Sequence, residues 1–293
     1  MKFGLFPNTT KNNIVEIVNE VIKKINANNG QVIISNSFKE IEEKFNDFIK
    51  KQNFADDDTL LNSCNFVISI GGDGTMLNTA YRTIKYNVPL FGVNFGKLGF
   101  LAEYDILNLE SSIRDIMKGN YIIDERMILE GECISNNSEC FYSVNDFVVE
   151  KGPWPKMIEM ELYVDDNFVT CFLADGLIIA SPTGSTAYSL SVGGPIVSPN
   201  ADAITISPIS PHSLTMRPLV LSAKQKIKVI AKSQHKSIQI NSDGQRVENY
   251  LTPVQFVFRK SEKCLKLVKP ATANYFETLR NKLMWGFDVR NNN

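Results

Sequence analysis

A glycine-rich turn with a single carboxylate follows an apolar run early in the chain. Residues 66–75 read Phe-Val-Ile-Ser-Ile-Gly-Gly-Asp-Gly-Thr, and the carboxylate belongs to Asp73. Glycine has no Cβ and tolerates positive φ, so these glycines would let bare backbone N–H groups approach an anion beside Asp73. Residues 76–85 have helical character, and a helix N-terminus adds partial positive charge where a phosphate would lie. We therefore expect phosphate chemistry here, with a phosphate-donor loop formed by Gly71, Gly72, Gly74 and Thr75.

The same turn has a plainer interpretation, in which a tight strand-to-helix connection uses Asp73 only as a helix cap. The short motif leaves both interpretations open. A second glycine cluster covers residues 92–101, directly after a strand candidate at 90–93. Because ligands of an open α/β sheet bind at the carboxyl ends of its strands, we expect this cluster beside Asp73, although a structural loop would have the same composition. Lys97 within it is either a phosphate partner or an ordinary surface lysine.

The longest informative stretch is residues 174–191, where an apolar strand runs into a turn dense in hydroxyls and glycine. Such a loop can offer many short donors and acceptors to a polar ligand, with Tyr188 as a flat surface for stacking or hydrogen bonding. A Ser/Thr helix cap explains any one hydroxyl but not five of them in one loop. Asn145 and Asp146 interrupt another strand-like run, 142–150, as either a bulge or a ligand contact.

Composition excludes several classes of protein. The 293 residues are 43% hydrophobic, and 31 basic side chains against 32 acidic ones give a net charge of −1. This balance provides no bulk attraction to nucleic acid or to an anionic membrane surface. The 5 cysteines are scattered and lack a CxxC pair, which argues against a disulfide framework or zinc site and for a cytoplasmic protein. No stretch has the length and apolarity of a signal peptide or a membrane span.

Two familiar catalytic arrangements are also unsupported. His212 and His235 are the only histidines, and their settings yield no Ser/His/Asp or Cys/His triad. The chain lacks the pattern Gly-x-x-x-x-Gly-Lys-Ser/Thr, so a P-loop mechanism has no basis in the sequence.

The surrounding pattern predicts two domains and a tail. Up to residue 118, short apolar runs alternate with helical periodicity, as expected of parallel βα units. From residue 121 onward, β-branched and aromatic runs separated by turns, one of them Ser242-Asp243-Gly244, predict a β-rich domain. Residues 275–285 return to helical spacing, with Phe276, Leu279 and Leu283 on one face, and residues 291–293 are expected to fray. We therefore expect an α/β domain over 1–118, a β-rich domain over 119–270 and a C-terminal tail over 271–293.

Together these segments resemble the NAD kinase family over roughly residues 66–286. The family's Gly-Gly-Asp-Gly-Thr turn stands at 71–75, its Asn-x-Gly-x-Leu-Gly-Phe-Leu segment at 94–101, and its stretch from Asp-Gly to Ser-Thr-Ala-Tyr at 175–188. Its Pro-His-Ser-Leu segment stands at 211–214, and residues 217–218, 243–245 and 279–286 also fit. Lipid kinases and phosphofructokinases carry similar Gly-Gly-Asp-Gly turns, whereas the hydroxyl-rich stretch is far more specific.

The resemblance implies a doubly wound α/β domain, a β-sandwich-like domain, and a helical tail that returns to the first domain. It implies phosphorylation of the 2′-hydroxyl of the adenosine ribose of NAD, with Asp73 accepting the proton. The donor would be ATP or polyphosphate, the metal a divalent cation such as Mg²⁺, and the assembly a homodimer or homotetramer. The implied NAD site comprises Asp73, Gly74, Asn145, Asp146, Lys156, Asp175, Thr186, Ala187, Tyr188, Ser189, Leu190, Ser191 and Gln245.

The chain departs from the family pattern at three positions. Asp146 stands where many members have Glu, Ser181 stands where Thr is usual, and Lys156 occupies a position that varies between basic residues. The shorter side chain of Asp146 affects the reach of one NAD contact.

Two other functions remain as alternatives at this stage. A diacylglycerol-type lipid kinase shares the glycine turn but would need an apolar acceptor pocket, whereas residues 181–191 are polar. A non-catalytic dinucleotide-binding module would keep the Tyr188 loop but would need no carboxylate at Asp73. The sequence does not name the metal ligands, the range of donors, or whether NADH is accepted.

Overall fold

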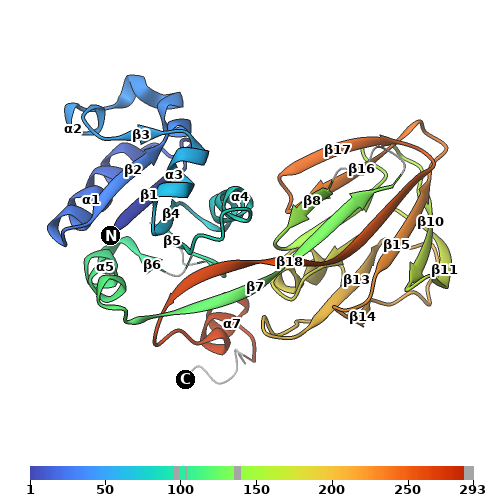
Figure 1. The fold of residues 1–293 in the computed structure, drawn as a ribbon. Helices are drawn as coiled ribbons and strands as arrows, with labels where there is room; N and C mark the ends of the chain where they lie inside the picture. The colour runs from blue at the N-terminus through green and yellow to red at the C-terminus, as the bar shows by residue number, and fades with distance from the viewer. Residues whose placement is uncertain (95–98, 103, 135–139, 287–293) are drawn as a thin grey trace, which may run out of the picture. The chain divides into compact units, whose positions relative to one another are not determined.

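The computed structural model describes residues 1–94, 99–102, 104–134 and 140–286 (Figure 1). Lys97 and residues 291–293 therefore lie outside the described part of the chain. The chain forms two compact units: Met1–Glu125 with Leu265–Asn293, and Arg126–Cys264. The boundaries between the units fall inside two long strands, β7 (Tyr121–Cys133) and β18 (Val254–Pro270).

The first unit is built on a parallel sheet in the order β18-β5-β4-β1-β2-β3, with β6 also pairing with β5. Leu267 of β18 pairs in parallel with Leu90 of β5. Strand β4 is buried along its whole length, as expected of a central strand covered on both faces. The strands are β1 (Lys2–Pro7), β2 (Gln31–Ser35), β3 (Phe54–Ala55), β4 (Phe66–Ile70), β5 (Leu90–Asn94) and β6 (Tyr104–Asp105).

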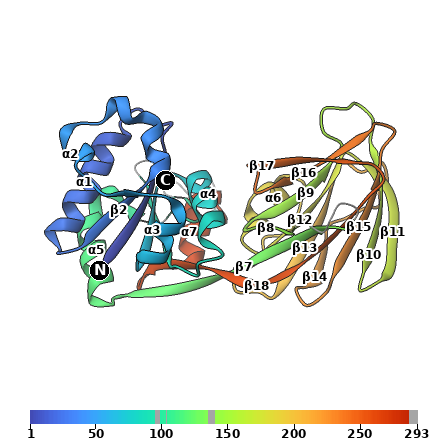
Figure 2. The same cartoon turned by 45° about the horizontal axis from the view of Figure 1, so that its top comes forward.

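Helices cover both faces of this sheet (Figure 2). On one face, α1 and α5 pack into a core with Phe3, Leu5 and Ile68 of the strands. On the other face, a Cβ at Gly4 would lie 2.3 Å from Cδ2 of Leu60 in α3, and the hydroxyl of Thr79 in α4 donates to Ser69. The helical segments are α1 (Ile14–Ala27), η1 (Asn36–Lys44), α2 (Asp47–Lys50), α3 (Asp57–Ser63), α4 (Asp73–Thr83), η2 (Ile106–Asn108), α5 (Leu109–Lys118) and α7 (Tyr275–Leu283).

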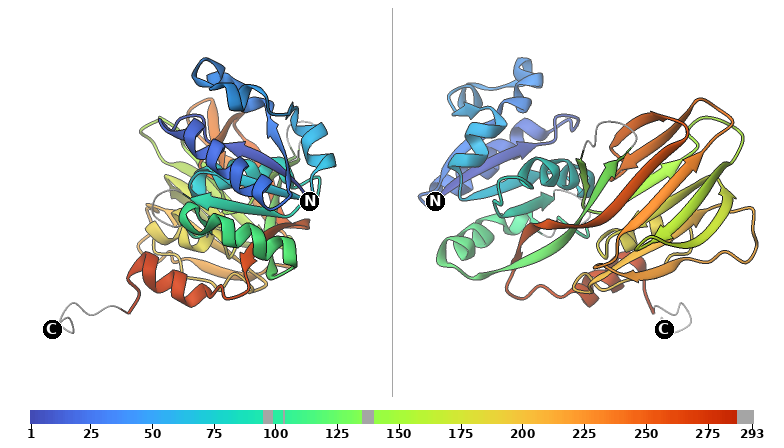
Figure 3. Two further views of the ribbon diagram at one scale, coloured as in Figure 1. Left: turned by 90° about the vertical axis from the view of Figure 1, so that its left-hand side faces the viewer. Right: turned by 45° about the vertical axis from the view of Figure 1, so that its right-hand side comes forward.

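The second unit consists of two packed layers of antiparallel strands (Figure 3). One sheet has the order β14-β13-β12-β9-β16-β17, and the other has the order β11-β10-β15-β18, with β7 beside β18 and β8 beside β7. Their inner faces share one core, in which the rings of Phe147 and Phe258 lie 5.3 Å apart.

The remaining elements belong to this second unit. They are β8 (Cys140–Ser143), β9 (Asp146–Glu150), β10 (Ile158–Val164), β11 (Asn167–Ala174), β12 (Gly176–Ala180), η3 (Gly184–Thr186), α6 (Tyr188–Ser191), β13 (Ala203–Ile209), β14 (Leu219–Ser222), β15 (Ile227–Lys232), β16 (Ser237–Ser242) and β17 (Arg246–Leu251).

The expected fold class is confirmed: a doubly wound α/β unit, a β-sandwich-like unit and a C-terminal helix. In the predicted apolar face of α7, Leu279 is 4% exposed but Phe276 is 59% exposed, so the face is narrower than the spacing indicated. Within the described ranges, no helix has the length and apolarity that crossing a membrane requires.

Candidate functional site

Asp73 lies where β4 ends and α4 begins, and its carboxylate reaches the second glycine segment. Oδ2 accepts a hydrogen bond from the N–H of Phe100 at 2.8 Å, and Oδ1 accepts from Leu101 at 3.1 Å and Ala102 at 3.2 Å. The N-cap of α4 is Gly72, and no side chain caps the helix. The interpretation of Asp73 as a helix cap is therefore wrong. The carboxylate instead ties the two glycine segments together at the carboxyl ends of neighbouring parallel strands.

The glycines of this region are explained by the close approach of other atoms to the backbone, and not by a left-handed backbone conformation. Gly71, Gly72 and Gly74 all have negative φ. A Cβ at Gly71 would lie 2.3 Å from the Thr75 hydroxyl, and one at Gly99 would lie 1.8 Å from Oδ1 of Asp73. A Cβ at Gly72 would meet no atom within 4 Å, so the backbone there borders open space. That arrangement suits a ligand that approaches the bare backbone closely.

In the second unit, Asn145 and Asp146 lie at the start of β9. The N–H of Asn145 donates to Oδ1 of Asp243 at 2.7 Å, and its carbonyl accepts from the N–H of Ser181 at 2.8 Å. Asp146 is 3% exposed. Burial, and secondarily the negative charge of Asp243, raise the pKa of Asp146 to about 7. This carboxyl group therefore changes its charge near neutral pH.

The hydroxyl-rich stretch contributes more to its own structure than its composition suggests. Ser181 donates to the carbonyl of Val144 at 2.6 Å, Ser185 to that of Pro182 at 2.7 Å, and Ser189 shares a 3.0 Å hydrogen bond with Ser207. These serine side chains are completely buried. Tyr188, by contrast, is 44% exposed. A ligand that contacts this stretch therefore meets mainly Thr186, Ala187, Tyr188, Leu190 and Ser191.

The predicted site residues of this unit fall at two ends of its strands. Asn145, Asp146 and Ser181 lie together at one end, because Asp146 pairs with Ala180 in the register of β9 and β12. Gln245 follows Asp243 in the turn beside them, and its N–H donates to the carbonyl of Ser242 at 3.1 Å.

Asp175 lies at the other end of β12, where its carboxylate forms a 2.7 Å ion pair with Lys151. The five-residue length of β12 places about 16 Å between the two ends. Lys156 follows β9 on the same side as Asp175, and its ammonium group donates to Gln234 at 2.6 Å.

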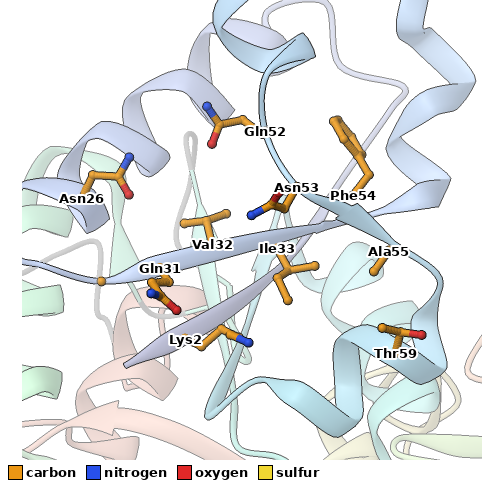
Figure 4. A pocket seen from close by; sticks show the side chains of 11 residues that line it. Lys2, Asn26, Gln31, Val32, Ile33, Gln52, Asn53, Phe54, Ala55 and Thr59 are labelled. Atoms are coloured by element: carbon orange, nitrogen blue, oxygen red, sulfur yellow. The ribbon is translucent and has the colours of Figure 1, made fainter.

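The first unit contains a cavity, whose lining residues are shown in Figure 4. Its volume is about 520 Å³, and Lys2, Gln31, Val32, Gln52 and Asn53 are among its lining residues. Lys2 and Gln31 begin β1 and β2, so the cavity lies at the amino ends of the strands, whereas Asp73 follows the carboxyl end of β4. We do not assign it to the site around Asp73.

Within the described ranges, no group of three or more His, Cys, Asp or Glu side chains could hold a metal ion. Mg²⁺ in phosphotransferases is commonly bound by one or two carboxylates together with the phosphates of the substrate. Asp73 is the single carboxylate of the glycine turn, so a cation bound there would take most of its ligands from the phosphates of the donor. All five cysteines are free.

Comparison with known proteins supports the resemblance. The chain matches the family model described as ATP-NAD kinase N-terminal domain over residues 3–121, and the one described as ATP-NAD kinase C-terminal domain over residues 144–270. An NAD kinase of Thermoanaerobacter sp. (strain X514) is 35% identical over 284 residues, which cover 96% of this chain and 98% of the relative. An NAD kinase of Heliobacterium modesticaldum is 41% identical over 228 residues, covering 77% and 81%.

Solved structures agree with these matches. The crystal structure of yeast NADH kinase complexed with NADH has a TM-score of 0.87 and 25% identity, covering 99% of this chain and 88% of the other. The structure of an NAD kinase from Archaeoglobus fulgidus in complex with ATP has a TM-score of 0.74 and 23% identity, covering 97% and 99%. The likeness to the second structure concerns the fold alone.

Proposed function

The chain belongs to the NAD kinase family, and from this premise we propose that it phosphorylates the 2′-hydroxyl of the adenosine ribose of NAD, with ATP as donor, to form NADP. The observation that carries the proposal is the placement of the Asp73 carboxylate. Three backbone N–H groups hold it at the junction of β4 and α4, next to glycine backbone that borders open space. A carboxylate fixed in this way can serve as a base without moving.

Asp73 accepts the proton of the ribose hydroxyl as the new oxygen–phosphorus bond forms, while the bond between the γ-phosphorus of ATP and its β,γ-bridging oxygen breaks and ADP leaves. A positioned general base typically contributes 10²–10⁴-fold to the rate. The transition state of phosphoryl transfer is loose and carries its charge on the phosphoryl oxygens, so the protein needs no covalent nucleophile. The N-terminus of α4 and the loop of Gly71, Gly72, Gly74 and Thr75 would stabilise the donor phosphates. The N–H of Gly71 already donates to the carbonyl of Val93 at 3.0 Å, so Gly71 would contribute close approach and not a donor.

NAD recognition is proposed for the residues that the family resemblance implies. Asp73 and Gly74 would contact the adenosine ribose, and the exposed side chain of Tyr188 supports a role in stacking or hydrogen bonding. Ser189 is completely buried and hydrogen-bonded to Ser207. It would therefore act through its backbone or by supporting the hydroxyl-rich stretch. The remaining proposed contacts are Asn145, Asp146, Lys156, Asp175, Thr186, Ala187, Leu190, Ser191 and Gln245.

A divalent cation, expected to be Mg²⁺, belongs to the proposal. When bound, it would neutralise the charge of the donor phosphates. The net charge of −1 provides no general field for a triphosphate. Polyphosphate as a second donor is part of the same proposal, since phosphate chains share the chemistry that the turn would recognise.

The proposed cellular context rests on composition. Five free thiols favour a reducing compartment, so we place the protein in the cytoplasm. A homodimer or homotetramer is proposed on the family resemblance.

The direct test is to incubate the protein with NAD, ATP and Mg²⁺ and to measure NADP with an NADP-specific dehydrogenase. The proposal predicts NADP formation that stops when ATP, NAD or Mg²⁺ is omitted. Parallel reactions contain NADH or diacylglycerol in place of NAD. Phosphorylation of diacylglycerol without NADP formation, or ATP consumption without phosphorylated dinucleotide, would contradict the proposal.

A further inference from the structure

Asp243 makes an unusually complete set of hydrogen bonds inside the second unit. Its side chain is completely buried. Oδ1 accepts from the N–H of Asn145 at 2.7 Å and of Asp146 at 3.3 Å, and Oδ2 accepts from the N–H of Val144 at 3.1 Å. The hydroxyl of Ser143 lies within hydrogen-bond distance of both Oδ1 and the carbonyl of Asp146, the latter at 2.7 Å, and can donate its proton to either. One carboxylate thus accepts hydrogen bonds from three consecutive backbone N–H groups about 100 positions away in the sequence.

The turn that carries Asp243 explains why this residue type suits the position. Asp243 has φ 55 and Gly244 has φ 66, so both lie in the left-handed region between β16 and β17. Aspartate and asparagine tolerate that region better than other residues with a Cβ. The N–H of Asp243 donates to the carbonyl of Asp146 at 3.0 Å, so the turn binds this segment with its backbone as well as its side chain.

The opposite side of the same segment is held by the hydroxyl-rich stretch. The Ser181 hydroxyl donates to the carbonyl of Val144 at 2.6 Å, and the Ser181 N–H donates to that of Asn145 at 2.8 Å. A Cβ at Gly184 would lie 2.0 Å from the carbonyl oxygen of Asn145. The N–H groups of residues 144–146 are therefore bound by the Asp243 carboxylate. Ser181 binds the carbonyls of Val144 and Asn145, and the N–H of Asp243 binds that of Asp146.

We propose that Asp243 is a positioning residue for NAD recognition: it fixes the backbone of residues 144–146 so that the side chains of Asn145 and Asp146 meet the dinucleotide. This inference rests on the proposed function, because it takes Asn145 and Asp146 as NAD contacts. Asp243 itself need not touch NAD.

The charge of Asp243 is also part of this arrangement. The guanidinium group of Arg246 lies 3.0 Å from Oδ2 and balances the buried carboxylate. Asp146 lies beside it, and the negative charge of Asp243 contributes to the raised pKa of Asp146. Removing that charge lowers the pKa of Asp146, so the pH at which NAD recognition changes should move down.

Asp243→Asn is the most informative variant, because asparagine tolerates the left-handed backbone but has one acceptor oxygen and no charge. The matched control is Asp165→Asn. Asp165 also has positive φ in a hairpin turn of the same unit and also accepts a backbone N–H, that of Lys226 at 2.9 Å, but it contacts none of the proposed NAD residues.

Two measurements test the proposal. By hydrogen exchange without NAD, the amides of residues 144–146 should exchange about tenfold faster or more in Asp243→Asn than in wild type and Asp165→Asn. In steady-state kinetics, Asp243→Asn should raise KM for NAD about tenfold while kcat changes less than about threefold. The pH at which KM for NAD changes should be lower in Asp243→Asn than in wild type. A variant with unchanged exchange of these amides and unchanged KM would overturn the proposal, as would equal losses in kcat for both variants.

If Asp243→Asn does not fold, Ser143→Ala replaces it, since it removes one donor to the carboxylate and leaves the charge. The Ser143 hydroxyl also lies 2.7 Å from the carbonyl of Asp146, so this variant is compared by the exchange of the Val144 and Asn145 amides. Ser143→Ala should also speed amide exchange and raise KM for NAD, each by a smaller factor than Asp243→Asn. Unchanged exchange and unchanged KM would refute the inference. The exchange measurement needs no turnover. Suppose that the wild-type protein forms no NADP, but the amides of residues 144–146 still exchange faster in Asp243→Asn than in wild type. That result would overturn the proposed function while supporting the positioning of residues 144–146 by Asp243.

Discussion

Replacing Asp73 with asparagine should separate its catalytic role from its structural one. The carboxylate uses both oxygens to accept three backbone N–H groups, whereas asparagine has one acceptor oxygen and would turn its NH₂ group toward at least one of these donors. Hydrogen bonds to a charged group contribute about 1.5–3 kcal/mol each, and an acidic group near a helix N-terminus adds about 0.3–1 kcal/mol. We expect the free energy of unfolding to fall by about 2–3 kcal/mol.

The same substitution removes the base. We expect kcat to fall at least about 10²-fold, which corresponds to roughly 2.7 kcal/mol of transition-state stabilisation. At about 2–4 °C per kcal/mol, the melting temperature should fall by several degrees, yet the variant should fold and bind NAD at lower temperature.

The assay combines single-turnover phosphorylation, thermal melting and NAD titration. The control is Asp56→Asn, which changes a carboxylate of the same unit that accepts the N–H of Thr59 at 2.9 Å and caps α3. This control should leave turnover unchanged. An Asp73→Asn protein that is folded, binds NAD and turns over within a few-fold of wild type would remove Asp73 from the mechanism.

Three further predictions concern recognition, the metal and pH. Tyr188→Ala should raise KM for NAD more than it lowers kcat, because the exposed ring positions the ligand, and an unchanged KM in steady-state assays would remove Tyr188 from the site. Thorough chelation should abolish turnover and added Mg²⁺ should restore it; full activity in chelator would refute metal dependence. The pKa of Asp146 is about 7 in the folded protein, raised by burial and Asp243, so the folded state retains a proton that the unfolded chain releases. The stability should therefore decrease between about pH 4 and pH 7 by up to about 1.4 kcal/mol per unit; urea unfolding should show this slope in wild type and lose it in Asp146→Asn.

Much of the first unit could be predicted because its signals are local. The continuous apolar run of β4 indicates a buried parallel strand, and β4 is buried along its length and pairs in parallel with β1 and β5. The hydrogen bonds from Phe100, Leu101 and Ala102 to Asp73 could not be predicted. They depend on a turn almost 30 residues away, and a short motif carries no information about such a partner.

In the second unit, the sequence could not predict which side chains are exposed and which residues lie together. Counting hydroxyls in residues 181–191 indicated a polar site, but composition could not tell the buried Ser185 and Ser189 from the exposed Tyr188. The register of β9 against β12 decides which predicted residues lie together, and antiparallel pairing is not visible in the motifs. Asp243 was recognised as part of a turn but not as a partner of Asn145, because only the folded sheet brings them together.

The most direct test of the account is to identify the atom that receives the phosphoryl group. The protein is incubated with MgATP and either NAD or an NAD analogue that lacks the 2′-hydroxyl of the adenosine ribose, and the products are examined by ³¹P NMR. The account predicts a single new phosphomonoester on the 2′-oxygen of NAD and no phosphorylation of the analogue. Phosphate at another position of NAD, or equal phosphorylation of the analogue, would contradict it.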